Sequence, residues 1–385
     1  MKILSTTMKV VAVWFRNDLR VHDNGSLNKA ASLVKDKVAS HVLPVYTYDP
    51  RYFGQDARSR LTGIPKTGLH RQHFIAESLR DLRKSLRKIG SDLLISEGRP
   101  EDVFAKLLPR GSTIITQKEV TQDEQDADLL VNNAGFDLQT VWGLTMYDLN
   151  DILSRRGPQQ GADFSSCMTM TNKLTKSGIQ VRPLLPTPKD GDLPFPETVA
   201  HNDEALELYG KARAQQPFIY SVDADERLVY DDDYTYEVDR RGVMGNWRNA
   251  ERPGIRGGET VGLTRAGYYI VKKPKLLDNY KNTRNGMLHA DYSSKFSAWL
   301  AHGCISPRLV YHLIKQHEKK DGGPNPGTQH MLLEMRFRDF FIFYTRQHNP
   351  KIFFLNGVRP RKDAKWLPSD RAMPLFRKWI RGETG

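Results

Sequence analysis

Short apolar runs and helix-like segments alternate along the first 145 residues of the chain. The apolar runs have the length of buried strands, and the segments between them carry apolar residues at helical spacing. This alternation is typical of a mostly parallel sheet with helices on both faces. The expected strands are Val10–Phe15, His41–Tyr48, Asp92–Ser96, Thr113–Thr116 and Asp137–Trp142, and the expected helices are Leu27–Val34, His70–Ile89, Glu101–Leu107 and Asp123–Asn133.

A sheet of this kind binds ligands outside the carboxyl ends of its strands. We therefore expect a site among the loops that follow Phe15, Tyr48 and Thr116. The first of these loops, Arg16–Arg20, lacks the glycine-rich dinucleotide fingerprint, and the chain contains no P-loop. The sequence thus disfavours an ordinary nicotinamide-binding domain.

The regular pattern ends near Gly157 and returns near Gly258. Proline, glycine and charged residues dominate between them, which is typical of a long connection over the surface. Helical spacing follows, in the segments Thr260–Val271, Pro274–Tyr280, Lys295–Ala301, Pro307–His317, His330–Thr345 and Pro374–Trp379. We therefore predict an α/β plus all-α protein, with an α/β domain over residues 8–150, a linker over 151–257 and a helical domain over 258–385.

Composition describes a globular chain of 385 residues, 39% hydrophobic and 27% charged, with no apolar run long enough to span a bilayer. Its two cysteines, Cys167 and Cys304, argue against a disulfide framework and indicate a reducing compartment. Charge is uneven: residues 256–385 contain 24 Lys and Arg against 10 Asp and Glu, a net of +14, while the whole chain is +13. This asymmetry points first to nucleic acid as a partner, although a merely solvated basic surface remains open.

Residues 291–307, DYSSKFSAWLAHGCISP, combine hydroxyls and a cation with the start of an expected helix. Backbone N–H groups, hydroxyls and a lysine in such a place can bind phosphate. An ordinary serine N-cap on a core helix explains the same residues. Local chemistry leaves both interpretations open.

Longer stretches resemble DNA photolyases and cryptochromes. The stretch at 13–24, VWFRNDLRVHDN, resembles the opening of both groups, and the stretch at 283–312, TRNGMLHADYSSKFSAWLAHGCISPRLVYH, resembles the DASH branch of the cryptochromes in particular. The likeness continues through 337–359 and 378–385 and covers nearly the whole chain in order. It implies a Rossmann-like antenna domain, a linker and a helical FAD domain, in a blue-light flavoprotein that repairs cyclobutane pyrimidine dimers and prefers single-stranded DNA.

The resemblance also implies roles for particular residues. The flavin would contact Tyr280 and Arg338, and its phosphates would lie at Ser293, Ser294, Lys295, Phe296 and Ser297. Glu334 and Phe337 would hold and stack the flipped dimer, since they lie three apart on one helix face. A DNA phosphate would meet Arg284, Trp366 would be the outer member of the photoreduction chain, and Glu119 would hold an antenna such as 5,10-methenyltetrahydrofolate. By their charge, Arg359, Arg361 and Lys362 are further candidates for phosphate contacts. From the residues alone, this basic cluster could equally be a solvated loop, Glu334 a surface or helix-pairing acid, and Phe337 a core aromatic.

Two departures from the family pattern affect these expectations. Phe337 stands where the family usually has a tryptophan, and phenylalanine offers less stacking area and no N–H donor. The phrase at residues 382–385 leads in the family into further helices that complete the flavin pocket, so we expect a truncated helical domain, impaired flavin binding and an exposed apolar face.

The sequence leaves three functions open. The first is light-driven repair of pyrimidine dimers, as a monomer without membrane contact. The second is a blue-light photoreceptor that signals without repair, because both groups share these motifs. The third is a flavin-free nucleic-acid binder, whose mark would be salt-dependent binding that light does not change.

Overall fold

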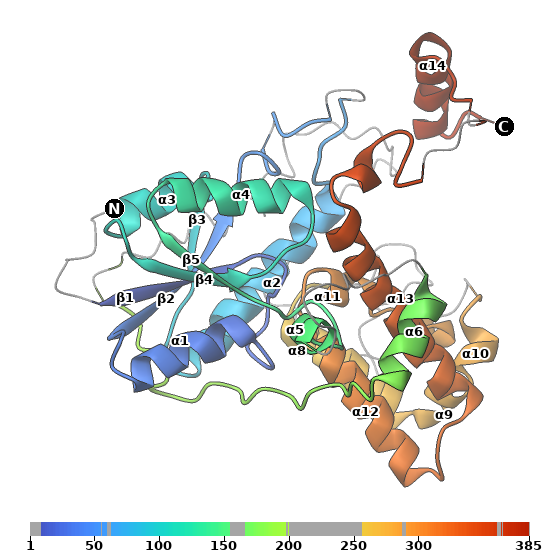
Figure 1. The fold of residues 1–385 in the computed structure, drawn as a ribbon, viewed down its shortest axis with the longest axis horizontal. Helices are drawn as coiled ribbons and strands as arrows, with labels where there is room; N and C mark the ends of the chain where they lie inside the picture. Colours follow the sequence, from blue (N-terminus) through green and yellow to red (C-terminus); the bar gives the residue numbers. More distant parts are fainter. Residues whose placement is uncertain are drawn as a thin grey trace, which may run out of the picture.

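The computed structural model describes residues 9–54, 56–59, 63–154, 166–197, 199, 256–286, 290–359, 363 and 365–384. An α/β part at the N-terminal end lies beside a helical part (Figure 1). Within the described residues, no helix combines the length and apolar character needed to cross a bilayer.

Five parallel strands form one sheet in the order β3-β2-β1-β4-β5. The central strand is β1, Val10–Phe15, in register with β2, His41–Tyr48, and β4, Thr113–Gln117. The outer strands are β3, Leu94–Glu97, and β5, Asp137–Val141. The parallel sheet predicted from the apolar runs is confirmed, with β3 starting two residues later than expected.

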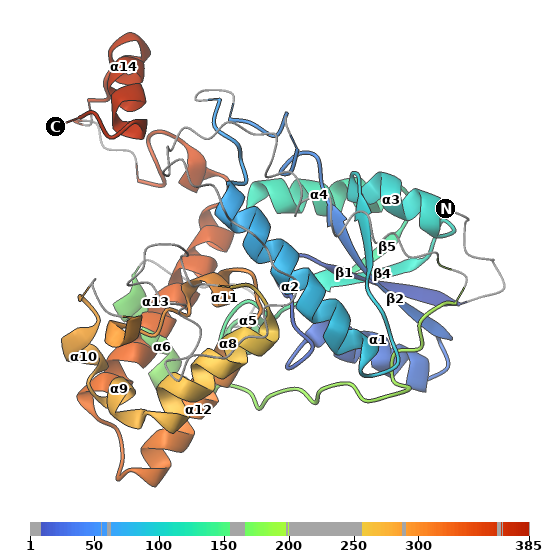
Figure 2. The same ribbon diagram turned by 180° about the vertical axis from the view of Figure 1, so that it is seen from behind.

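Helices cover both faces of this sheet, as predicted (Figures 1 and 2). Val11, Val13 and Phe15 point to the face covered by α1, Gly25–Lys35, and α2, Leu69–Arg87. The intervening residues of β1 point to the other face, covered by α3, Pro100–Leu107, and α4, Gln122–Asn133. The period-two alternation of a strand thus divides the core into two layers.

The second half of the chain is helical, as predicted. Its segments are α8, Glu259–Ala266, a π-helical turn at Gly267–Lys272, α9, Pro274–Asp278, α10, Tyr280–Thr283, α11, Ser297–Ala301, α12, Pro307–Lys320, α13, Pro326–His348, and α14, Ser369–Ile380, with 3₁₀ turns at Ala290–Tyr292 and Lys351–Phe353.

Several helices differ from the sequence expectation. Helix α13 begins four residues early, because Asn325 caps it through the N–H groups of Gly327 and Thr328. The stretch expected to be a connection, residues 151–257, contains α6, Cys167–Lys176, and its start overlaps α5, Leu149–Ser154. Ser166 caps α6 through the N–H of Thr169, and its apolar face packs into the core.

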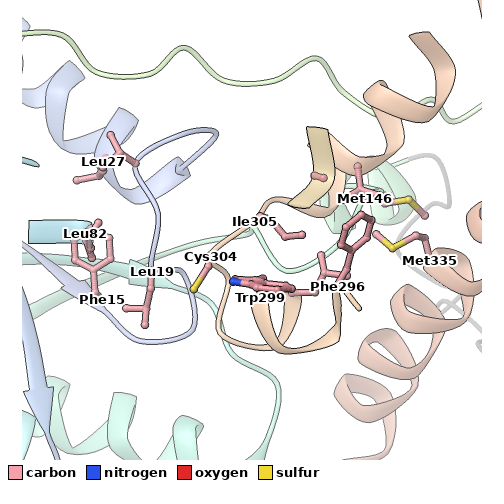
Figure 3. Close-up of a cluster of buried hydrophobic side chains, with 14 of the residues drawn as sticks. Phe15, Leu19, Leu27, Leu82, Met146, Phe296, Trp299, Cys304, Ile305 and Met335 are labelled. Carbon is pink, nitrogen blue, oxygen red and sulfur yellow. The ribbon is translucent and has the colours of Figure 1, made fainter. Parts of the chain in front are cut away.

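One hydrophobic core runs through both parts of the molecule (Figure 3). Leu19, from the loop after β1, lies near Trp299 and Ile305 of the helical part, and all three side chains are fully buried. Gly303 allows this approach, because its φ is +65° and a Cβ there would lie 2.0 Å from the Asn17 carbonyl oxygen. The Leu19 N–H donates to the His302 carbonyl at 3.1 Å beside it.

Asp23 fastens the loop after β1 to the helical part. Its side chain is 1% exposed and accepts two bonds from Arg308 of α12, Nη2 to Oδ1 at 2.6 Å and Nε to Oδ2 at 2.9 Å. The hydroxyl of Ser306, the N-cap of α12, donates to the same carboxylate. Because both charges are out of water, removal of either would leave its partner buried and uncompensated.

Glu259, the first residue of α8, makes a second fastening to the same loop. It accepts the N–H groups of Val21 at 2.8 Å and His22 at 2.9 Å, and the His22 Nδ1 lies 2.6 Å from its Oε1. The Ser306 N–H donates to His22 Nε2 at 3.1 Å, so Nδ1 carries the ring hydrogen. Burial raises the pKa of Glu259, but these bonds outweigh it and hold the pKa below its ordinary value. We call the Asp23–Arg308 and Glu259–His22 contacts the interdomain clasp.

The clasp makes Asp23→Ala a severe change. The variant leaves the Arg308 guanidinium buried without its carboxylate, so we expect a loss of about 3–5 kcal/mol in the free energy of unfolding. Urea unfolding followed by circular dichroism measures the loss. Glu383→Ala, at an exposed ion pair with Arg381, is the control and should leave the midpoint unchanged. Equal midpoints for Asp23→Ala and the wild type would contradict the assigned role.

Candidate functional site

Three residues assigned to different roles in the sequence come together between α10 and α13. The Tyr280 hydroxyl donates to Oε2 of Glu334. Arg284 Nη1 lies 3.2 Å from Oε1 of Glu334, and His330 Nε2 lies 3.5 Å from the same oxygen. The expected flavin, lesion and DNA contacts therefore share one carboxylate, and His330 is an addition that the sequence did not single out.

Burial sets the chemistry of Tyr280. Tyr280 is 4% exposed, and desolvation, followed by the hydrogen bond to the Glu334 carboxylate, raises the pKa of its hydroxyl. Tyr280 is therefore a neutral donor at ordinary pH. The Glu334 side chain is 39% exposed, so this carboxylate has a buried donor on one side and solvent on the other.

The same face of α13 carries exposed rings. Phe337 is 42% exposed and Phe341 is 59% exposed, three and seven residues after Glu334. At these spacings the side chains line one helical face. The Glu334 carboxylate thus lies beside two apolar rings, on a face of α13 that is accessible to solvent.

Arg265 organises the loop at Ser293–Ser297 from inside. Its fully buried guanidinium donates to the Ser294 carbonyl (Nε, 3.0 Å), the Ser293 carbonyl (Nη2, 3.0 Å) and Asp291 Oδ1 (Nη1, 2.8 Å). The Tyr268 hydroxyl donates to the other Asp291 oxygen at 3.1 Å. With these carbonyls bound inward, the loop conformation is fixed by the protein itself.

The helix beside this loop differs from the sequence expectation in its start and its cap. It begins at Ser297, whereas we expected Lys295, and Lys295 has a φ of +61°. The N-cap is the buried Phe296, which makes no side-chain capping bond, so a serine cap is excluded here. With only five residues, α11 contributes little dipole, and any phosphate site rests on the loop's own donors.

Arg338 lies between the two parts of the molecule. Its Nη1 donates to the Leu144 carbonyl at 2.5 Å and its Nη2 to the Leu300 carbonyl at 3.1 Å, near the end of α11. Burial lowers the pKa of this guanidinium. Its placement beside a flavin ring stays a prediction, while its contacts here join α13 to the chain on both sides.

Asp339 was missed in the sequence. It is fully buried in α13 and accepts the N–H groups of Met146, at 3.0 and 3.2 Å, and Tyr147, at 3.2 Å. Burial nevertheless raises its pKa to about 7. An acid directly beside an arginine, just before the apolar run Phe340–Phe343, was the available signal.

Glu119 lies just past β4, at the carboxyl edge where the fold predicts a site. Its Oε1 accepts from Gln117 Nε2 at 3.3 Å and Asn17 Nδ2 at 3.4 Å. Burial raises its pKa to about 7, against the opposing charge of Arg16. Arg16 itself stacks over Trp14 at 4.4 Å and pairs with Asp128 at 2.8 Å.

Where the structure describes them, the remaining predicted residues make no bond to the Tyr280–Glu334–Arg284 cluster, but Arg359 lies beside Phe341 of the ring-bearing face of α13. Arg359 is exposed and lines a cavity of about 460 Å³ with Phe340, Phe341, Tyr344, Ile352, Gly357 and Val358. Trp366 is 58% exposed, in the segment before α14. Arg361 and Lys362 fall outside the described residues. Within the described part of the chain, no hydrogen bond or ion pair joins Glu119 or Trp366 to the Tyr280–Glu334–Arg284 cluster.

Comparisons with known proteins agree with this arrangement of a parallel sheet and a helical part. A sequence profile of the DNA photolyase family matches residues 11–188. Cryptochrome DASH of Synechocystis sp. is 34% identical, over 97% of this chain and 67% of its own length. The solved Synechocystis cryptochrome superposes with a TM-score of 0.71 at 31% identity, covering 96% of this chain and 68% of that one.

The fold and these matches define a photolyase-type flavoprotein architecture. This chain belongs to the photolyase and cryptochrome family, in its cryptochrome DASH branch. The chloroplastic/mitochondrial cryptochrome DASH of Ostreococcus tauri is 33% identical over 97% of this chain, and the chain spans 66% of that relative's length. Members of the family bind FAD.

The raised pKa of Asp339 predicts a pH dependence. Between about pH 4 and 7 the folded state holds a proton on Asp339 that the unfolded state has lost, so stability falls as pH rises through this range. Asp339→Asn removes one titrating group. It should reduce the slope of the free energy of unfolding against pH by at most about 1.4 kcal/mol per pH unit. Urea midpoints at pH 5 and pH 8 measure this. The prediction fails if the variant and the wild type show the same difference between the two pH values.

Proposed function

We propose that this protein is a blue-light, FAD-dependent DNA repair enzyme of the cryptochrome DASH type. It splits cyclobutane pyrimidine dimers and favours single-stranded DNA. The observation that carries the proposal is the Tyr280–Glu334–Arg284 cluster beside the exposed Phe337 ring. Family membership supports the chemistry, and the cluster supports binding of a polar, planar lesion at this place.

The loop donors fit the phosphates of FAD. Arg265 binds the Ser293 and Ser294 carbonyls inward, and among the described residues the Ser293, Ser294 and Ser297 hydroxyls have no protein partner. With the Lys295 ammonium they form a set of hydroxyl and cationic donors that suits a diphosphate. When bound and reduced, FAD supplies light-driven transfer of one electron to the lesion.

Glu334 would bind the edge of the flipped dimer. Its carboxylate oxygens are acceptors only, and each has more than one lone-pair direction, so Oε2 can hold Tyr280 and also accept a pyrimidine N–H. The Tyr280 and Arg284 contacts fix the orientation of this acceptor before the lesion arrives. Phe337 would then stack on the pyrimidine face.

The preference for single strands follows from the cost of flipping. A damaged base must leave the stack, which costs a few kcal/mol and least where no partner strand is present. Arg284, Arg359, Arg361 and Lys362 would contact phosphates, so affinity should fall steeply with salt. We propose a monomer for this reaction, with Trp366 at the outer end of an electron path and Glu119 at an antenna site, where folate is one candidate.

Glu334→Ala tests the lesion contact. Loss of a charge-assisted hydrogen bond of about 1.5–3 kcal/mol should weaken binding of a dimer-containing single strand by about 10- to 100-fold. Binding of the same undamaged strand should change little. Fluorescence anisotropy with both oligonucleotides measures the two affinities, and Asp370→Ala on α14 is the control. An equal loss on both strands would assign Glu334 to general DNA binding.

A photoreceptor without repair is the second candidate, and Phe337 is the observation that favours it, since the ring is smaller than the tryptophan usual in the family. Phe337→Trp should raise dimer repair several-fold if stacking limits it, because the larger ring buries more area. Repair of a dimer oligonucleotide under blue light is the measurement. Intact dimers in both proteins, with flavin bound and photoreduced, would favour the photoreceptor.

A further inference from the structure

Charges on α2 are sorted by face. Glu77 and Asp81 face the helical part, where Glu77 accepts the Gly257 N–H at 2.8 Å and Asp81 accepts the Thr260 N–H and hydroxyl, each at 2.8 Å. A second face carries only cations, around a surface cavity of about 500 Å³. These cations, which we call the α2 ridge, are Arg80, Arg83, Lys84, Arg87 and Lys88.

A single buried acid holds the middle of the ridge. Asp92 is 7% exposed and accepts from Arg83 Nε at 2.9 Å and Arg87 Nε at 3.0 Å. One carboxylate thus orients two guanidiniums, and within the described residues no ion pair joins Arg80, Lys84 or Lys88 to an acid. The apolar face of α2, with Leu79, Leu82 and Leu86 fully buried, fixes the helix beneath them.

The spacing of the exposed cations suits a phosphate backbone. Arg80, Lys84 and Lys88 are exposed and follow each other at four-residue intervals, so they rise about 6 Å per step and span about 12 Å. Over that length one strand of a duplex presents roughly three or four phosphates. The row can therefore follow a backbone.

We propose that the α2 ridge binds the phosphate backbone of nucleic acid, as a contact surface separate from the proposed lesion site. The lining of the ridge contains no apolar or aromatic residue. A protein partner needs such anchors for most of its binding energy, whereas backbone binding rests on charge alone. The planar guanidinium of an arginine can also donate two parallel hydrogen bonds to phosphate oxygens.

The ridge and the lesion cluster lie on different parts of the molecule. Helix α2 belongs to the α/β part and lies in front in Figure 2, whereas Tyr280, Arg284 and Glu334 lie on α10 and α13. Among the described residues, no hydrogen bond or ion pair links the ridge to the cluster. Its contribution to binding should therefore add to that of Arg284.

The test is a matched pair of triple variants. Arg80→Gln, Lys84→Gln and Lys88→Gln neutralise the ridge while Arg83 and Arg87 keep their bonds to Asp92. Lys35→Gln, Lys106→Gln and Arg110→Gln remove the same residue types from exposed positions on the same domain. Anisotropy measures binding to an undamaged oligonucleotide, single-stranded and duplex, over a series of salt concentrations.

We expect the ridge variant to lower the salt slope of log K by about 2 on single strands and about 3 on duplex, because three phosphate contacts are lost. The control variant should keep the wild-type slope. Lys84→Arg with Lys88→Arg preserves the charges and should keep the slope as well. The same loss in an Arg284→Gln background would show that the two surfaces act separately.

Three results would overturn the proposal. Equal losses in the ridge and control variants would assign the effect to net charge. If the ridge variant has a wild-type thermal midpoint and an unchanged salt slope of log K, the ridge does not bind nucleic acid. Binding to phosphatidylserine vesicles that depends on the ridge, with oligonucleotide binding unaffected, would assign the surface to an anionic membrane.

Discussion

The buried ion pair between Asp23 and Arg308 is the contact on which the arrangement of the two parts depends. It is reinforced by Glu259, which binds the backbone of the same loop and the ring of His22. Part of the family-like stretch at 13–24, namely Val21, His22 and Asp23, therefore serves to join the two parts. A buried carboxylate or guanidinium is costly without its partner. The two parts must therefore pack in the one arrangement that pairs Asp23 with Arg308.

Much of the fold was predictable because its signals are local. Apolar runs gave the strands, and their alternation with amphipathic segments gave the parallel sheet. The start of α13 was misplaced because apolar spacing was followed in preference to its cap, whereas the start expected at Pro374 is a proline inside α14. The Asn325–Pro326 pair is an N-cap followed by proline at the first helical position, the same signal that correctly placed the start at Ser306–Pro307.

The candidate site was predictable only in part. Residue type and family likeness identified Tyr280, Arg284 and Glu334, but their convergence on one carboxylate depends on how α10 packs against α13. Arg265 and Asp339 gave weaker signals, because a buried charge is recognised by its partners, and those partners are backbone groups far away in sequence. The sorting of acids and cations on α2 was likewise hidden until Gly257 and Thr260 were placed beside Glu77 and Asp81.

The inward hold of Arg265 on the Ser293–Ser294 carbonyls has a consequence for affinity. A loop that must be ordered by its ligand reduces the apparent affinity by the fraction of time it is correctly formed. Here the bonds from Arg265 order the loop during folding, before any ligand arrives. If the loop binds phosphates as proposed, their affinity depends on Arg265 and on the Tyr269 ring, whose centroid lies 5.1 Å from the Arg265 guanidinium carbon.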